Sequence, residues 1–168
     1  PMQTDHKWID KREMVMFHDA VLASMGLNPC LQPPPRRAVL FIKADNGRTM
    51  SATPPEQVEK LKHALITEAN MKSVVVVNST KYTLKEQIQF LLNASVVIVP
   101  GGGAGFISFF AAKDSQVIIP AYILEQESFN AASCYSRLTY FGFKKYPEYP
   151  IGAIISAITI SPPSLICP

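Results

Sequence analysis

A run of glycines follows an uncharged, β-branched stretch of the chain. Val96 to Val99 has the composition of a buried strand, Pro100 ends it, and Gly101-Gly-Gly-Ala-Gly105 comes next. An apolar run from Phe106 to Ala112 is then compatible with a helix. Backbone N–H groups at such a helix start are free to hold an anion. A tight strand-to-helix connection that needs glycine only for packing has the same pattern, because the run is neither G-x-G-x-x-G nor a Walker loop.

Two basic residues follow a second strand-like segment. Ala38 to Lys43 is typical of a buried parallel strand, and Ala44-Asp-Asn-Gly-Arg-Thr49 is typical of a turn. Ligands gather at the carboxyl ends of strands in open α/β sheets. We therefore expect Lys43 and Arg48 to lie where a phosphate or a sugar could meet them.

Helices and strands alternate around these segments. Asp5 to Met25 has helical spacing and ends at Gly26, while His6 and His18 on or near it are typical of surface or packing residues. Thr53 is expected to cap a helix that reaches about Ala69. The residues expected to face inward from it are Val58, Leu61, Leu65 and Ile66, with His63 on its outer side.

A third helix has the clearest start signal. Thr83 and Glu86 have the spacing of a capping box, and the apolar stripe behind them comprises Leu84, Ile88, Leu91 and Leu92. Ser73 to Val77 precedes this helix as a strand, and Gln116 to Ile119 is a later strand that Pro120 is expected to stop. Weaker patterns indicate a helix over 128–138 and a short strand over 139–143.

This order of elements predicts an α/β fold, a Rossmann-like open parallel sheet with helices on both faces. We divide the chain into an N-terminal helix with a proline-rich connector (1–37), a Rossmann-like domain (38–150) and a C-terminal tail (151–168) that is expected to continue in a longer protein. No Ser/His/Asp order, paired carboxylates or metal-ligand spacing is evident, so the sequence identifies no catalytic residue by number, and we predict no metal site.

Composition excludes several classes of protein. The chain has 168 residues, 48% of them hydrophobic and 17% charged, as in a globular domain. A net charge of +3 is too small to indicate a nucleic-acid partner, and Arg36-Arg37 is expected to be a solvated pair. No apolar run is long enough to span a membrane. Cys30, Cys134 and Cys167 allow one disulfide and a free thiol, or three thiols.

Whole segments of the chain resemble glycosyltransferase family 61. The segments are RRAVLFIKADNGRTM, VEKLKHAL and YTLKEQIQFLLNASVVIVPGGGAGFISFFAAKDSQVIIP, and the resemblance covers about residues 10–125. The family includes relatives of plant xylan arabinosyl- and xylosyltransferases and the O-linked N-acetylglucosamine transferase of the endoplasmic reticulum lumen. Its members have the two-domain GT-B fold. The chain is similar to the C-terminal half, which holds the nucleotide sugar.

The resemblance implies a donor-binding site. Gly103, Ala104 and Gly105 match the family's Gly-Ala-Gly beside the donor diphosphate, and Gly102 stands where the family usually has His. Arg48 and Lys43 match basic positions after the first strand. Thr83 and Gln87 match the polar start of the helix before the glycine strand, where the resemblance implies that they support the loop or reach the nucleotide. The alternatives are that Thr83 only caps the helix and that Gln87 is simply solvated.

The implied reaction transfers a sugar, most plausibly from a UDP-sugar, to a hydroxyl of a glycan or protein acceptor, with no cofactor required. The N-terminal half would supply the acceptor site, and a membrane would be reached only through segments outside this chain. The sequons Asn78-Ser-Thr80 and Asn93-Ala-Ser95 are compatible with the Golgi or endoplasmic reticulum lumen. One alternative is a degenerate, non-catalytic module that is a structural or binding component of a larger assembly. The glycine run also resembles that of cytokinin-activating phosphoribohydrolases, although Phe106-Ile-Ser follows it here.

Overall fold

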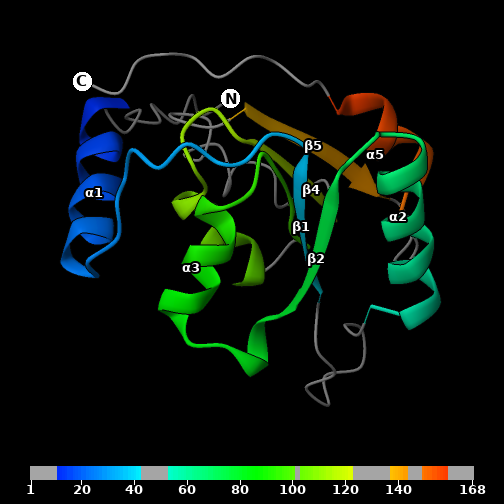
Figure 1. Cartoon of the computed structure of the whole chain (residues 1–168), viewed down its shortest axis with the longest axis horizontal. Helices are drawn as coiled ribbons and strands as arrows, with labels where there is room; N and C mark the ends of the chain where they lie inside the picture. Colours follow the sequence, from blue (N-terminus) through cyan, green and yellow to red (C-terminus); the bar gives the residue numbers. More distant parts are fainter. Residues whose placement is uncertain (1–10, 43–52, 101–102, 123–136, 144–148, 159–168) are drawn as a thin grey trace, which may run out of the picture.

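The fold is a five-stranded sheet, seen in a computed structural model of the chain (Figure 1). The structure describes residues 11–42, 53–100, 103–122, 137–143 and 149–158. The strands are β1 (Arg37–Ile42), β2 (Ser73–Asn78), β3 (Val96–Ile98), β4 (Gln116–Tyr122) and β5 (Arg137–Phe143). Their spatial order is β2-β1-β3-β4-β5, and every neighbouring pair is parallel. The predicted Rossmann-like α/β architecture is confirmed.

Strand β1 lies between β2 and β3, and this position defines the topology. Ala38 is in register with Val74 of β2 on one side and with Val96 of β3 on the other. The chain therefore runs outward from β1 to β2 and then crosses back over β1 to reach β3. In doubly wound sheets, the point where the strand order reverses is where ligands bind.

Helices cover both faces of the sheet, with α3 on one side and α2 and α5 on the other (Figure 1). The helical segments are α1 (Lys11–Ser24), α2 (Pro55–Thr67), η1 (Ser79–Lys81), α3 (Leu84–Leu92), η2 (Gly103–Phe110) and α5 (Ile151–Ala157). Segments η1 and η2 are 3₁₀ helices. Leu22 of α1 and Ile154 of α5 are fully buried, so both helices pack against the sheet.

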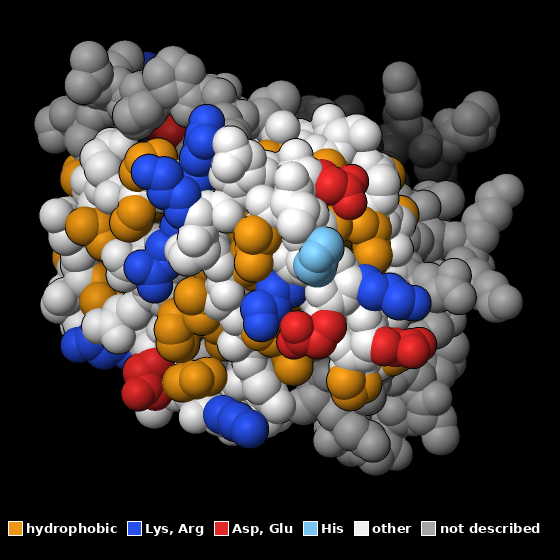
Figure 2. Space-filling view, turned by 45° about the vertical axis from the view of Figure 1, so that its right-hand side comes forward, with side chains coloured by type: hydrophobic (Ala, Val, Ile, Leu, Met, Phe, Trp, Pro, Cys, Tyr) orange, Lys and Arg blue, Asp and Glu red, His pale blue; other side chains and the backbone are white. Residues whose placement is uncertain are grey.

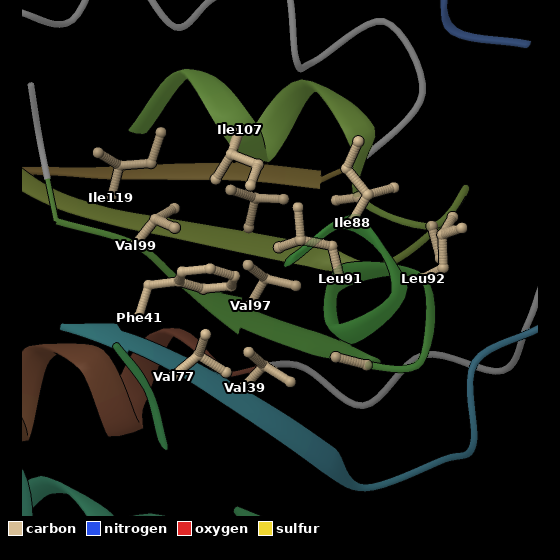
Figure 3. Packing of buried hydrophobic residues seen from close by; sticks show 14 of the residues in the cluster. Val39, Phe41, Val77, Ile88, Leu91, Leu92, Val97, Val99, Ile107 and Ile119 are labelled. Carbon is tan, nitrogen blue, oxygen red and sulfur yellow. The ribbon is translucent and has the colours of Figure 1, made fainter. Parts of the chain in front are cut away.

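Alternation along the strands divides the apolar core into two clusters. The first cluster packs α1, α3 and η2 against one face (Figure 3). Its members in the central strands include Val39, Phe41, Val97 and Val99, and Ile107 of η2 points toward them. The second cluster joins α2 and α5 to the alternate strand residues, which are Ala38, Leu40, Val96, Ile98 and Ile118. A sheet that is buried on both faces requires these uninterrupted apolar strands.

Helix α1 ends as predicted at Gly26. This glycine has φ +69°, its N–H donates to the carbonyl oxygen of Ala23 at 2.9 Å, and the N–H of Leu27 donates to that of Leu22 at 2.9 Å. The pair of bonds is a Schellman motif, which requires a left-handed residue after the helix. The chain turns here toward the proline-rich connector.

The expected cap of α2 is wrong. Pro54 is the N-cap residue, with φ −59° and ψ 133°, and no side chain caps the helix. Because Pro55 follows, Pro54 is sterically kept out of the helical region, so the helix begins one residue after the position that Thr53 would set. His63 is exposed, as expected, but Ile66 is 46% exposed because it follows Leu65 by 100° around the helix, outside the stripe that faces the sheet.

Three further expectations are corrected. Leu84 is 52% exposed because it is the first residue of α3, and the buried stripe begins at Ile88. Pro120 does not stop β4, which continues to Tyr122. Strand β3 pairs with β4 only as far as Ile118, so at Pro120 the ladder is needed on one side alone and a missing N–H is tolerated. The predicted helix over 128–138 is wrong at its end, because residues 137 and 138 belong to strand β5. Residues 128–136 lie outside the described part of the chain.

Candidate functional site

The carboxyl ends of β1 and β3 form the centre of the candidate site. Leu40 of β1 is in register with Ile98 of β3, so these two strands end side by side. This is the switch point of the sheet, because β2 and β3 lie on opposite sides of β1. Lys43, Arg48 and Gly102 belong to the segments that follow β1 and β3 but lie outside the described residues, so their assignment to the site stays a prediction.

The helix after the glycine turn differs from the expected one. It is a 3₁₀ helix over Gly103–Phe110, whereas an α-helix starting near Phe106 was expected. Glycine is a poor α-helix former, and short helical connectors are often 3₁₀. In a 3₁₀ helix the N–H groups of the first two residues have no acceptor within the helix. The amides available to an anion are therefore those of Gly103 and Ala104, two of the residues for which the family resemblance implies contact with the diphosphate.

Packing fixes η2 against the sheet. Ile107 is 9% exposed and belongs to the first core cluster, and Ala111 directly after the helix is fully buried there. Ser108 is also fully buried, and its hydroxyl has no hydrogen-bond partner in the described chain. Phe106, near the helix start, is 48% exposed and its ring lies 6.1 Å from that of Phe109. Phe106 is thus half exposed, while the residues that follow it anchor the helix in the core.

A polar network connects α1 to the end of η2. His18 is 1% exposed, its Nδ1 lies 2.8 Å from Oδ1 of Asp19, and its Nε2 lies 3.3 Å from the carbonyl oxygen of Ala111. Nζ of Lys113 donates to Oδ2 of Asp19 at 3.0 Å. The imidazole also stacks on Phe110, with 6.3 Å between ring centroids. These contacts hold the segment after η2 in place from the side of α1.

The charges of this network act on Asp19. Partial burial acts to raise the pKa of the Asp19 carboxyl, but hydrogen bonds from His18 and Lys113, together with their charges, outweigh it and the pKa lies below 3.8. Sequence analysis treated His18 as an isolated histidine that packs or is solvated. It packs, but with a carboxylate partner, and the adjacent Asp19 was the available signal.

Thr83 caps α3 as predicted, at the carboxyl end of β2. Its Oγ1 accepts from the backbone N–H of Glu86 at 3.3 Å, and Oε2 of Glu86 accepts from the backbone N–H of Thr83 at 2.8 Å. The hydrogen bonds from the backbone N–H and the hydroxyl of Thr83 lower the pKa of the exposed Glu86 carboxyl. The capping box is complete, so capping alone accounts for the residue types at both positions.

Gln87 supports the loop in front of α3. Its Nε2 donates to the carbonyl oxygen of Ser79 at 2.9 Å and to that of Tyr82 at 2.8 Å. The side chain is half-buried, so the alternative of a freely solvated glutamine is wrong. Thr83 and Gln87 together fix the segment that leaves β2 beside the switch point. Contact of either side chain with a nucleotide remains a proposal.

The residues of the two sequons make local hydrogen bonds. Oδ1 of Asn78 accepts from the N–H and the hydroxyl of Thr80, at 3.1 Å and 2.8 Å. Nδ2 of Asn93 donates to the carbonyl oxygen of Gln89 at 2.9 Å, at the end of α3. Asn78 therefore caps η1, and Asn93 closes α3 ahead of the strand that carries the glycine turn.

Cys30 is joined to a second cysteine by a disulfide bond, and that partner lies outside the described residues. The backbone N–H of Cys30 donates to Oδ1 of Asn28 at 2.9 Å, which fixes the turn that carries the cysteine. Of the two possibilities that the cysteine count left open, the structure has the disulfide.

Two searches of the described residues were negative. They include no group of three or more His, Cys, Asp and Glu side chains that could hold a metal ion. None of the helices in this part of the chain has the length and apolar composition of a membrane span. Compared with known proteins, the chain matches no protein-family model and no curated sequence. The function of the chain is therefore inferred from the geometry of the sheet edge and from the residues themselves.

Proposed function

We propose that the carboxyl edge of the sheet, at the β1/β3 switch point, binds the diphosphate of a nucleotide sugar. On this proposal the chain is the donor-binding half of a glycosyltransferase that transfers a sugar, most plausibly from a UDP-sugar, to a hydroxyl of a glycan or protein. The proposal gives this chain donor binding and names no catalytic base within it.

The start of η2 carries this proposal. Gly103, Ala104 and Gly105 follow β3 at the switch point, and the amides of Gly103 and Ala104 have no acceptor within the 3₁₀ helix. Two of the three residues have no Cβ, so a phosphate can approach the main chain closely. Aligned peptide dipoles add positive potential at a helix start, which favours an anion there.

Basic residues complete the proposed donor site. Lys43 and Arg48 follow β1 in the sequence, next to the strand that leads to the glycines. Their charges would neutralise the diphosphate as it leaves the sugar, so that catalysis is electrostatic. Thr83 and Gln87 hold the neighbouring loop after β2, and we assign them the task of keeping that side of the site in shape.

The proposed compartment is the lumen of the secretory pathway. A disulfide at Cys30 favours an oxidising compartment, since such bonds are rare in the cytosol. The two sequons agree with this location.

A thermal-shift titration with UDP, GDP, ADP and their common sugar conjugates tests the proposal. A ligand at one hundred times its Kd stabilises the folded state by about 2.7 kcal/mol. For a chain of this size, that corresponds to a rise in Tm of about 5–11 °C. We expect this rise with UDP or a UDP-sugar, and its loss in Gly103→Val.

The matched control is Gly152→Val on α5. Gly152 is exposed and has open space around a Cβ, and α5 covers the face of the sheet opposite to η2. The control variant should therefore keep the nucleotide response, and the Tm of each variant without ligand shows that it is folded. Flat curves for every nucleotide would contradict donor binding and favour the non-catalytic structural module.

A further inference from the structure

Three basic residues lie on adjacent backbone segments at the amino edge of the sheet, opposite to the proposed donor site. Arg36 and Arg37 stand at the start of β1, and Lys72 directly precedes β2. The backbone N–H groups of Lys72 and Ser73 both donate to the carbonyl oxygen of Arg36, at 2.8 Å and 3.4 Å. The three residues, which we call the amino-edge triad, are therefore held on adjacent segments of backbone.

The amino-edge triad has no acidic partner among the residues that the structure describes. None of its members takes part in the ion pairs found in the described chain, which join His18 and Lys113 to Asp19 and Lys62 to Glu59. The sequence has no Asp or Glu between residues 20 and 44 or between residues 69 and 85. Figure 2 shows Lys and Arg side chains gathered on the upper left of one face, toward the edge where β1 and β2 begin.

Arg37 also has a buried donor without an acceptor. Its Nε atom is screened from solvent and has no hydrogen-bond partner in the described chain, although the residue as a whole is only half-buried. Buried donors in proteins are normally paired, so an unpaired guanidinium nitrogen calls for an explanation. An anion on the triad would supply the missing acceptor once the Arg37 side chain turns its Nε toward solvent.

The backbone of the triad is set in advance. Arg36 has φ +58°, a left-handed conformation that is unfavourable for a residue with a Cβ. It persists because the N–H groups at the start of β2 bind its carbonyl oxygen, while buried Ala38 and Met71 fix the chain on either side. Pro33 to Pro35 further restrict the chain before it. Little backbone ordering is thus needed to bind a ligand here.

From these observations we infer that the amino-edge triad is a second anion site, which takes a phosphate- or sulfate-type oxyanion through Arg36, Arg37 and Lys72. Guanidinium groups pair with tetrahedral oxyanions through two parallel N–H donors, and the lysine adds a mobile charge. The ligand is a terminal phosphate or sulfate group, of a soluble molecule or of a lipid headgroup. This site is independent of the donor site, since it lies at the other end of the strands.

Backbone amide NMR shifts during titration with inorganic phosphate test this inference. We expect saturable shifts at residues 36, 37, 72 and 73, with an affinity for phosphate that is weakened by added NaCl. Loss of a hydrogen bond to a charged group weakens binding by about tenfold or more, which is the change expected in Arg37→Gln. The exposed Lys72→Gln, whose fold is less at risk, should weaken binding in the same direction. Lys60→Gln, which removes one exposed charge from α2, should leave it unchanged.

Two additional arms identify the source of the phosphate and separate the two sites. If the protein sediments with phosphatidylcholine vesicles that contain phosphatidic acid, and Arg37→Gln does not, the phosphate group belongs to a lipid. If the native protein does not sediment with these vesicles, the phosphate group belongs to a soluble molecule. Gly103→Val should leave phosphate binding at the triad intact, even if it abolishes nucleotide binding. Unsaturable shifts, or affinities in Arg37→Gln and Lys72→Gln equal to that of the native protein, would overturn the inference. So would vesicle binding without a saturable phosphate shift.

Discussion

Replacement of Gln87 by Glu tests how the loop before α3 is held. The amide Nε2 donates to two carbonyl oxygens, at 2.9 Å and 2.8 Å, so the variant Gln87→Glu places a carboxylate oxygen where two acceptors converge. The side chain keeps its size, so packing is preserved. The change therefore isolates the two hydrogen bonds between the glutamine and the loop.

The expected loss follows from these two bonds. Each contributes about 1 kcal/mol, so the free energy of unfolding falls by about 2 kcal/mol. A negative charge near the start of α3 returns up to about 0.5 kcal/mol through the helix dipole. The net loss of about 1.5 kcal/mol corresponds to a Tm lower by about 3–6 °C. Urea unfolding at pH 7 measures the free energy directly.

Gln89→Glu is the matched control for this change. Gln89 is exposed on the same helix, and its side chain makes no hydrogen bond in the described chain, so the same chemical change should be nearly neutral. The two carbonyl oxygens raise the pKa of the carboxyl introduced by Gln87→Glu, so the deficit is full above that folded pKa. Below the unfolded value of about 4.3 it falls to the loss of one hydrogen bond, because a protonated carboxyl has a single O–H donor. Equal stability of the two variants at pH 7 would refute the loop-holding role. A loss of UDP affinity in Gln87→Glu without loss of stability would indicate contact with the nucleotide instead.

Two other predictions concern glycine and charge. Gly26→Ala should destabilise the protein by about 1 kcal/mol, because Gly26 has φ +69°. Gly152→Ala in α5 should be neutral or stabilising by up to about 1 kcal/mol. Urea unfolding compares the two variants, and equal effects would contradict the Schellman assignment. The lowered pKa of Asp19 contributes stability that is present above 3.8 and is lost as pH falls through the folded pKa. Asp19→Asn should remove this part of the acid dependence of Tm, and an unchanged acid limb would show that the network contributes nothing.

The sheet and its order along the chain were predictable because local signals agree. Val96 and its neighbours are β-branched and uncharged, as a strand buried on both faces requires, and the capping box at Thr83 fixed the start of α3 to the residue. The start of α2 was missed by one residue because Pro55 restricts Pro54, an effect of neighbouring residues that outweighs the cap preference of Thr53.

Long-range pairing was beyond the reach of the sequence. His18 and Ala111 are in contact across the first core cluster, yet they are separated by 93 positions in the chain. The path of the loop determines which two carbonyl oxygens lie near Gln87, and no residue type in the loop predicts that path. Sequence patterns therefore identified Thr83 correctly as a helix cap, but not the two carbonyl oxygens that Gln87 binds.

The strand order gives the glycine turn its functional weight. The sequence shows that β3 precedes the glycines, but a tight connection serving only packing would have the same residues. If the strand order were β1-β2-β3, strand β2 would separate the carboxyl end of β1 from β3 and the start of η2. With β1 and β3 adjacent, the strand that precedes Lys43 and Arg48 in the sequence ends beside the strand that precedes the free amides of Gly103 and Ala104. A diphosphate, which needs both cations and main-chain donors, is therefore the ligand that we propose for this edge.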